Sequence, residues 1–228
     1  MTSHSDFGEI APEGWPVLAA AGIATILLAL IALPLGGFAL GLMLWLRHIL
    51  RIPVRRVPAD GDAVVAPADG VVTSIERQQQ IQDGQMQDGL PPMARITIRT
   101  RLTDAQLQRV PVTGRVRDNF LIPGLFLGAA DEVTARRDNE RREITLETDS
   151  GDAVMVVQIA TRTARQLICR HGPGRALAAG ASLGMARMGG LTDLFVPANA
   201  ALTVTEGQTV LAGETVLARL AGQQNGDR

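Results

Sequence analysis

Few side chains in this 228-residue chain are suited to covalent catalysis. The single cysteine, Cys169, sits in an apolar run, which predicts a buried, inert thiol and excludes an internal disulfide. The three histidines are scattered without metal-ligand spacing, so we expect no metal site. All 22 of the Lys and Arg residues are arginine, so no lysine is present to form an imine with pyridoxal phosphate. Two dipeptides are typical of tight turns, Asp69-Gly70 and Gly189-Gly190.

Four short motifs follow one another along the chain. Residues 51–58 read Arg-Ile-Pro-Val-Arg-Arg-Val-Pro, and residues 66–70 read Ala-Pro-Ala-Asp-Gly. Ile122-Pro123-Gly124 is then followed by Asn139-Glu140-Arg141. Residues 183–197 read Leu-Gly-Met-Ala-Arg-Met-Gly-Gly-Leu-Thr-Asp-Leu-Phe-Val-Pro. In this order and spacing the motifs resemble the short bacterial branch of the phosphatidylserine decarboxylase family, over about residues 15–220.

The resemblance implies a particular chemistry. Members of that family remove carbon dioxide from the serine headgroup of a phospholipid, using a pyruvoyl group as the electron sink. They make this group from their own chain: a serine in a Gly-Ser pair attacks the preceding carbonyl, the chain splits, and the serine becomes the pyruvoyl group. An aspartate and a histidine activate the serine, as in a catalytic triad. No external cofactor is therefore expected.

Mapped by motif, the reacting groups are largely missing from this chain. The triad aspartate falls on Asp69, which is retained, but the histidine position is Gln106 and the serine position is Gly190, after Gly189. Glycine offers no hydroxyl, and an amide is neither acid nor base near neutral pH. The nearest hydroxyl beyond the pair is that of Thr192, two residues out of register. These losses favour a catalytically inactive relative.

Three functions remain open at this level. The first is an inactive homologue that binds phosphatidylserine or an active paralogue. The second is a decarboxylase with an atypical site built on Asp69 and Arg109, and the third is a membrane adaptor that binds another protein. Arg109, Asn139, Glu140 and Arg141 are candidates for a headgroup pocket, although the last three also read as a solvated polar run. A homodimer is a further possible state, and the net charge of −1 gives no case for nucleic acid.

The elements that must position these residues are mainly strands. From residue 63 onward, short runs rich in β-branched residues alternate with Gly, Pro and Asp, which predicts a sheet-rich sandwich or barrel over residues 51–220. Residues 206–218 resemble the turn and strand of lipoyl-type barrel-sandwich domains. We expect a mobile loop over residues 78–92, a short helix over 161–168, and disordered tails over 1–14 and 221–228.

Residues 15–50 are expected to meet the membrane. Trp15 to Leu46 is an uncharged run broken by Pro34-Leu35-Gly36-Gly37, which suits either a span to about Leu33 with an interfacial helix after it, or a helical hairpin within one leaflet. Basic residues follow the run directly, which predicts an inner-membrane protein with its β domain on the cytoplasmic side and headgroup contacts by these residues. They are Arg47, Arg51, Arg55 and Arg56.

Overall fold

The computed structural model describes residues 15–49, 55–79 and 92–221. It divides into two compact units with the boundary between Val54 and Arg55. The expected tail at 1–14, all but Ala221 of the expected tail at 221–228, and Arg51 lie outside the described residues. Of the expected loop 78–92, residues 78–79 belong to a strand that runs Gly70–Gln79, and residues 80–91 lie outside the described residues.

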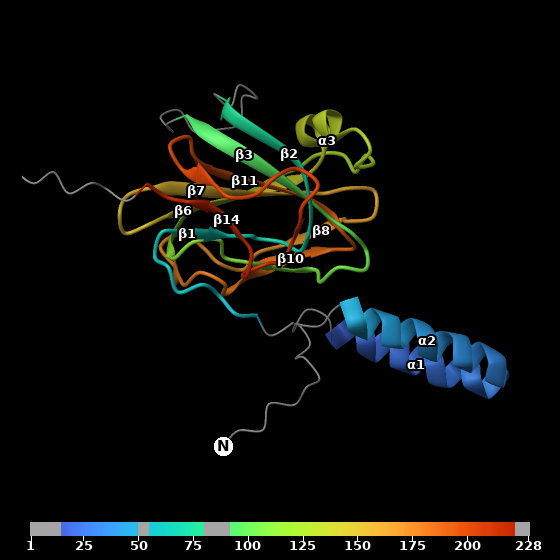
Figure 1. Ribbon diagram of the computed structural model, residues 1–228. Coiled ribbons are helices and arrows are strands. Elements are labelled where there is room, and N and C mark those ends of the chain that lie inside the picture. The colour runs from blue at the N-terminus through green and yellow to red at the C-terminus, as the bar shows by residue number, and fades with distance from the viewer. Residues whose placement is uncertain (1–14, 50–54, 80–91, 222–228) are drawn as a thin grey trace, which may run out of the picture. The chain divides into compact units, whose positions relative to one another are not determined.

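The first unit is a helical hairpin. Helix α1 spans Trp15–Ile31 and helix α2 spans Leu33–Ile49, and the two pack side by side (Figure 1). The expected break at 34–37 is wrong: the chain leaves helical geometry only at Ala32, and Pro34 stands in the first turn of α2, where proline is tolerated. Gly36 allows the close approach, since a Cβ there would lie 2.5 Å from the Cβ of Ala29.

Most of the hairpin surface is apolar. Large side chains at the α1–α2 connection are strongly exposed, including Leu30 at 80%, Ile31 at 75% and Leu33 at 83%. The two helices form a hairpin, and within the described residues neither α1 nor α2 has the length and apolarity needed to cross a bilayer.

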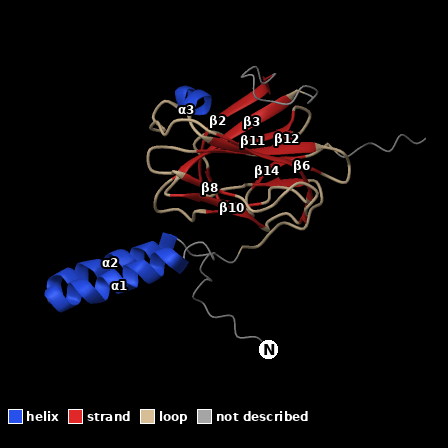
Figure 2. Ribbon diagram, turned by 180° about the vertical axis from the view of Figure 1, so that it is seen from behind, coloured by secondary structure: helices blue, strands red, loops and turns tan. Residues whose placement is uncertain are grey.

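The second unit is mainly β, as expected. Its largest sheet is curled and has eight strands in the order β13-β2-β3-β11-β7-β6-β5-β9, while β1-β14-β12 and β4-β10-β8 form two smaller sheets (Figures 1 and 2). The strands are β1 Ala63–Val65, β2 Gly70–Gln79, β3 Met93–Thr100, β4 Leu107–Arg109, β5 Gly114–Ile122, β6 Arg141–Glu147, β7 Ala153–Ile159, β8 Gln166–Ile168, β9 Ala176–Leu177, β10 Ser182–Arg187, β11 Gly190–Pro197, β12 Ala201–Leu202, β13 Thr209–Val210 and β14 Val216–Arg219.

The main core lies between the large sheet and the two small ones. Ile96, Ile144, Val156 and Leu194 on the large sheet are fully buried in one cluster with Leu183 of β10 and Leu217 of β14. The alternate residues of the same strands, such as Val157 and Leu191, face the other side of the large sheet. There they pack near α3, Glu132–Asp138, which is capped by Asp131.

One local expectation fails. Residues 161–168 do not form a helix, because Gln166–Ile168 is strand β8 and pairs antiparallel with β10. The predicted inert thiol lies on the segment that follows. Cys169 is half-buried against the core, and this burial raises the pKa of its thiol.

Candidate functional site

The structure brings the three mapped positions to the end of β3. Thr100, the last residue of β3, is paired with Gly190 in the sheet, and its hydroxyl donates to the Asp69 carbonyl at 2.7 Å. The chain then turns back through the segment that carries Gln106, whose Oε1 accepts from the Gly189 N–H at 2.6 Å. Residues 69, 106 and 189–190 therefore form one neighbourhood, although they lie far apart in sequence.

The turn at 188–190 joins strands of different sheets, β10 and β11. Its three residues, Met188, Gly189 and Gly190, all have positive φ, at 71°, 85° and 132°. A Cβ on Gly189 would lie 2.9 Å from the Thr100 carbonyl oxygen, so only glycine fits there. A Cβ on Gly190 would lie 3.2 Å from the Ile159 carbonyl oxygen and 3.4 Å from the Ala164 Cβ, which small shifts would relieve. Position 190, which maps to the serine of the resembled family, therefore carries no reactive side chain. It has room for a small side chain, at a backbone φ that favours glycine.

The buried Gln106 side chain joins two segments of this neighbourhood through hydrogen bonds. The side chain is only 2% exposed, and its Nε2 donates to the carbonyls of Arg101 at 3.1 Å and Asp104 at 2.6 Å. With Oε1 bonded to Gly189, the amide holds the 101–106 segment against the turn. Such an amide orients its partners and transfers no proton.

We expect Gln106→Leu to lower the free energy of unfolding by about 2–4 kcal/mol, because it leaves the buried Gly189 N–H without its partner. Urea unfolding of the full chain, followed by circular dichroism, measures this loss. Gln166→Leu is the control: Gln166 also accepts one bond, from Arg187, but is exposed, so its loss should stay under about 1 kcal/mol. Equal losses for the two variants would contradict the role given to Gln106.

The Asp69 carboxylate accepts its hydrogen bonds from Arg55 and Ala212 and not from Gln106. Its Oδ2 accepts from Arg55 Nη2 at 2.6 Å, and its Oδ1 accepts from the Ala212 N–H at 2.7 Å. Burial raises the pKa of Asp69 above its ordinary value, although the Ala212 N–H and the Arg55 guanidinium both lower it. The carboxylate thus links the segment that follows the helical hairpin to the C-terminal strands.

Arg55 departs from the predicted headgroup contact, whereas for Arg56 that prediction stays untested. The Arg55 side chain is 12% exposed and also lies 3.6 Å from Glu214, so the expectation of a headgroup contact is wrong for this residue. The Arg56 N–H donates to the same glutamate at 2.8 Å while its side chain is exposed. Arg47 lies in the last turn of α2 with His48. The prediction that Arg47 contacts headgroups stays untested.

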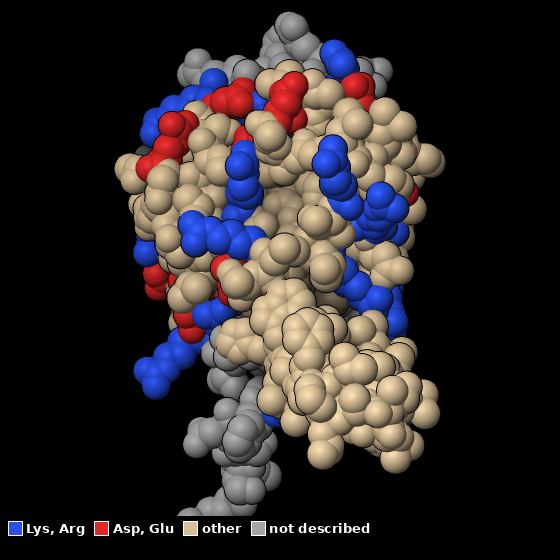
Figure 3. All heavy atoms as spheres, turned by 90° about the vertical axis from the view of Figure 1, so that its right-hand side faces the viewer, with Lys and Arg blue, Asp and Glu red and all other residues tan. Residues whose placement is uncertain are grey.

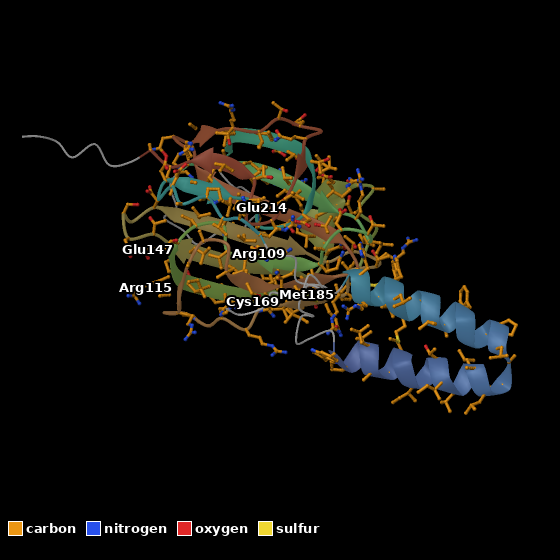
Figure 4. All side chains as sticks on the ribbon, turned by 60° about the horizontal axis from the view of Figure 1, so that its bottom comes forward. Arg109, Arg115, Glu147, Cys169, Met185 and Glu214 are labelled. Carbon is orange, nitrogen blue, oxygen red and sulfur yellow. The ribbon has the colours of Figure 1, made fainter. Side chains whose placement is uncertain are left out.

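The candidate pocket residues separate into different roles. Arg109 donates to the Gly180 carbonyl at 2.7 Å, and burial together with the nearby Arg55 lowers its pKa. Figure 4 shows Arg109 and Glu214 near one another on the β unit, consistent with the charge interaction between them. Asn139 is fully buried and bridges Leu127 and Ala160, with bonds of 2.8 Å from the Leu127 N–H and to the Ala160 carbonyl.

Glu140 and Arg141, which follow Asn139 in the chain, also make contacts within the β unit. The Glu140 N–H donates to the Leu125 carbonyl, and its own carbonyl accepts from Ala160. Arg141 is 4% exposed and pairs with Glu143 at 3.0 Å. Asn139 and Arg141 are therefore not part of a solvated polar run. The bonds of Asn139 fix the loop between β5 and β6, whereas the Arg141 pair lies within β6.

A buried polar chain next to the turn was missed by sequence reasoning. Gln158 Nε2 donates to Gln108 Oε1 at 2.6 Å, and Gln108 Nε2 donates to the Thr192 hydroxyl oxygen at 2.8 Å. All three side chains are nearly or fully buried. The Thr192 hydroxyl, the first one C-terminal to Gly190 in the sequence, is thus already bonded inside the core. Among the described residues, no group of three or more His, Cys, Asp or Glu is arranged to hold a metal ion.

Comparisons with known proteins point to one family. The family model described as phosphatidylserine decarboxylase matches residues 42–218. The chain is 38% identical over 211 residues to the phosphatidylserine decarboxylase proenzyme of Geotalea uraniireducens, covering 91% of this chain and 95% of the relative. It is 37% identical over 209 residues to the proenzyme of the same name from Beijerinckia indica, covering 92% and 88%.

Proposed function

Since this chain belongs to the phosphatidylserine decarboxylase family, we propose that it is a member that does not mature: an uncleaved, catalytically inactive homologue at a membrane. The observation that carries this proposal is Gly190 at the start of β11, with the Gln106 amide bonded to the residue before it. The family uses a pyruvoyl group that is made from its own chain. At Gly190 there is no side-chain oxygen to attack the Gly189 carbonyl, so neither the ester nor the pyruvoyl group forms.

The contacts also weigh against an atypical active site on Asp69 and Arg109. Both oxygens of the Asp69 carboxylate accept hydrogen bonds, from Arg55 and from the Ala212 N–H. Arg109 is tied to the Gly180 carbonyl. The absence of lysine from the sequence removes the other common way to form an imine.

The helical hairpin supports a place at the membrane. Each helix has 17 residues, or about 25 Å at about 1.5 Å per residue. Helix α1 carries exposed leucine and isoleucine side chains, and helix α2 carries exposed leucine and phenylalanine side chains. Arg47 lies in the last turn of α2, where a cationic side chain suits anionic headgroups. We propose insertion of the hairpin from the cytoplasmic face of a bacterial inner membrane, with phospholipid or a serine-containing relative as partner of the β unit.

The intact mass of protein purified in detergent tests the proposal. A single species near 24.2 kDa is expected. Two chains, one of them ending at Gly189, would refute it. A strain without other phosphatidylserine decarboxylases adds a second readout: this chain should give no turnover of phosphatidylserine. Turnover that disappears in Asp69→Asn would instead establish the atypical enzyme.

A further inference from the structure

Residues 123–139 leave the large sheet between β5 and β6 and return next to the point where they left, and we call this segment the strap. Ile122 and Arg141, on either side of it, are paired with each other in the sheet. Within the strap the Leu125 N–H donates to the Asp138 carbonyl at 2.7 Å. The pairing of β5 with β6 is thus complete without the strap, which can move away while the paired strands stay in place.

Few apolar contacts hold the strap on the rest of the β unit. All of its residues are described, and among them Ala135 is the only buried apolar one. Ala129 and Phe126 are partly buried against neighbouring clusters, whereas Leu125 and Val133 are 56% and 72% exposed. A segment that buries so little apolar surface opens at a lower free energy than the strands of the core.

Charged side chains supply the main attachment of α3 to the sheet. Arg136 Nε donates to Asp193 Oδ2 of β11 at 2.8 Å, and we call this ion pair the latch. Arg136 Nη2 also donates to the Thr97 hydroxyl oxygen at 2.8 Å, and that hydroxyl donates to Asp193 Oδ1 at 2.7 Å. Glu132 of α3 accepts from Arg136 at 3.0 Å and from Arg99 of β3 at 2.7 Å. The latch side chains are 10% and 3% exposed, so water hardly screens them.

The charges on this side of the β unit are paired and not of one sign. Figure 3 looks at the side that carries α3 and shows acidic and basic side chains next to one another over its upper part. In the latch, burial raises the pKa of Asp193, and Arg136 lowers it. Removal of Arg136 would leave a closed strap over a buried carboxylate without this cation, whereas an open strap lets water reach the carboxylate. The latch therefore favours the closed strap.

The strap also holds the segment that lines the side-chain position of residue 190. Asn139, its last residue, donates from Nδ2 to the Ala160 carbonyl at 2.8 Å. Residues 160–165 follow, and the Ala164 Cβ lies 3.4 Å from the place that a Cβ on Gly190 would take. When the strap leaves, the 160–165 segment loses this anchor.

We propose that the strap opens as one unit while the sheet stays folded, that the latch keeps it closed, and that its opening uncovers the side-chain position at residue 190. The strap then controls access to the turn at 188–190. The contacts that carry this inference do not involve the chemistry of residue 190, so it stands or falls separately from the inactive-homologue proposal.

Hydrogen exchange of the full chain in detergent, read by mass spectrometry, tests the opening. The amides of residues 125–139 should exchange together and faster than those of β7 and β11. In Arg136→Gln the strap amides should exchange at least about tenfold faster than in the unchanged chain, while β7 and β11 keep their rates. In the unchanged chain, low urea should barely accelerate strap exchange, because a local opening exposes little surface.

Arg137→Gln is the matched control, one position along the same helix. The Arg137 side chain is 71% exposed and pairs with Asp138 at 2.8 Å, so its loss should leave strap exchange unchanged. Equal acceleration in Arg136→Gln and Arg137→Gln overturns the role of the latch. Strap exchange that rises with urea as steeply as that of β11 overturns the local opening, and this readout needs no variant to fold.

A buried cysteine tests whether the opening reaches residue 190. With Cys169→Ser as background, Ala164→Cys places a thiol at a position that is 0% exposed. N-ethylmaleimide should modify this thiol at least about fivefold faster when Arg136→Gln is added, and at an unchanged rate when Arg137→Gln is added. A constant labelling rate beside faster strap exchange would overturn the connection between the strap and the turn.

Discussion

A chain carrying both Gly190→Ser and Gln106→His is expected to cut itself between positions 189 and 190. The room around the Gly190 Cβ position accepts a small side chain after small shifts, and the position-106 side chain already touches the turn. The new hydroxyl would attack the Gly189 carbonyl and pass its proton to the imidazole. The resulting ester would then break by elimination, which releases a chain that ends at Gly189.

The yield of cut chain, measured by mass spectrometry, should be at least about tenfold higher in the double variant than in either single variant, since residues of a triad act as a unit. Gly190→Ala with Gln106→His is the matched control, because it adds the same Cβ without a hydroxyl and should stay whole. Cleavage in this control would contradict the mechanism. A folded double variant that stays whole would show that restoring these two side chains does not restore self-cleavage. The Arg55–Asp69 pair would then be the next position to change.

Arg55→Ala is expected to lower the free energy of unfolding of the β unit by about 3–5 kcal/mol, because it leaves the buried Asp69 carboxylate without its cation. The two side chains are 12% and 8% exposed and lie 2.6 Å apart. Chemical unfolding followed by circular dichroism in the β region measures the loss. Tryptophan fluorescence is unsuitable, since both tryptophans, Trp15 and Trp45, are in the helical hairpin.

Arg219→Ala is the control for this measurement. Arg219 pairs with Asp60 and Asp62 at 2.8 and 3.0 Å, but its side chain is 43% exposed, so its loss should lower the free energy of unfolding far less than the loss of Arg55 does. A loss for Arg55→Ala as small as that for Arg219→Ala would mean that water screens the Asp69 pair as well. The anchoring of the 55–57 segment by Asp69 would then be wrong.

The sequence predicted the strands that are long and rich in β-branched residues, because alternation and turn residues are local signals. It did not predict β8, whose three residues are held only by pairing with β10, or the seven-residue helix α3. Local signals also failed at Pro34, which was predicted to break the helix but lies within α2. Its place in the first turn of α2 depends on the packing of that helix against α1.

The neighbourhood of the site was predictable from motif order, since residues 69, 106 and 189–190 were mapped together and lie together. The partners of these residues were not predictable. Arg55 was assigned to headgroups because basic residues after an apolar run usually contact them, but it is paired with Asp69 in the β unit. The chain from Gln158 through Gln108 to Thr192 joins residues 50 and 84 positions apart, and no local pattern reports such a contact.

The turn at 188–190 has a consequence for how the protein is assembled. It is the covalent link between β10 in one sheet and β11 at the centre of the other, so a cut there would turn one folding chain into two. A matured relative regains its structure only if two fragments find each other, and its modified terminus is not encoded in the gene. We have proposed that this chain stays uncut, which would keep everything needed for its fold in a single polypeptide. Its recovery from denaturant is then expected to be a unimolecular reaction, with a rate that does not depend on protein concentration.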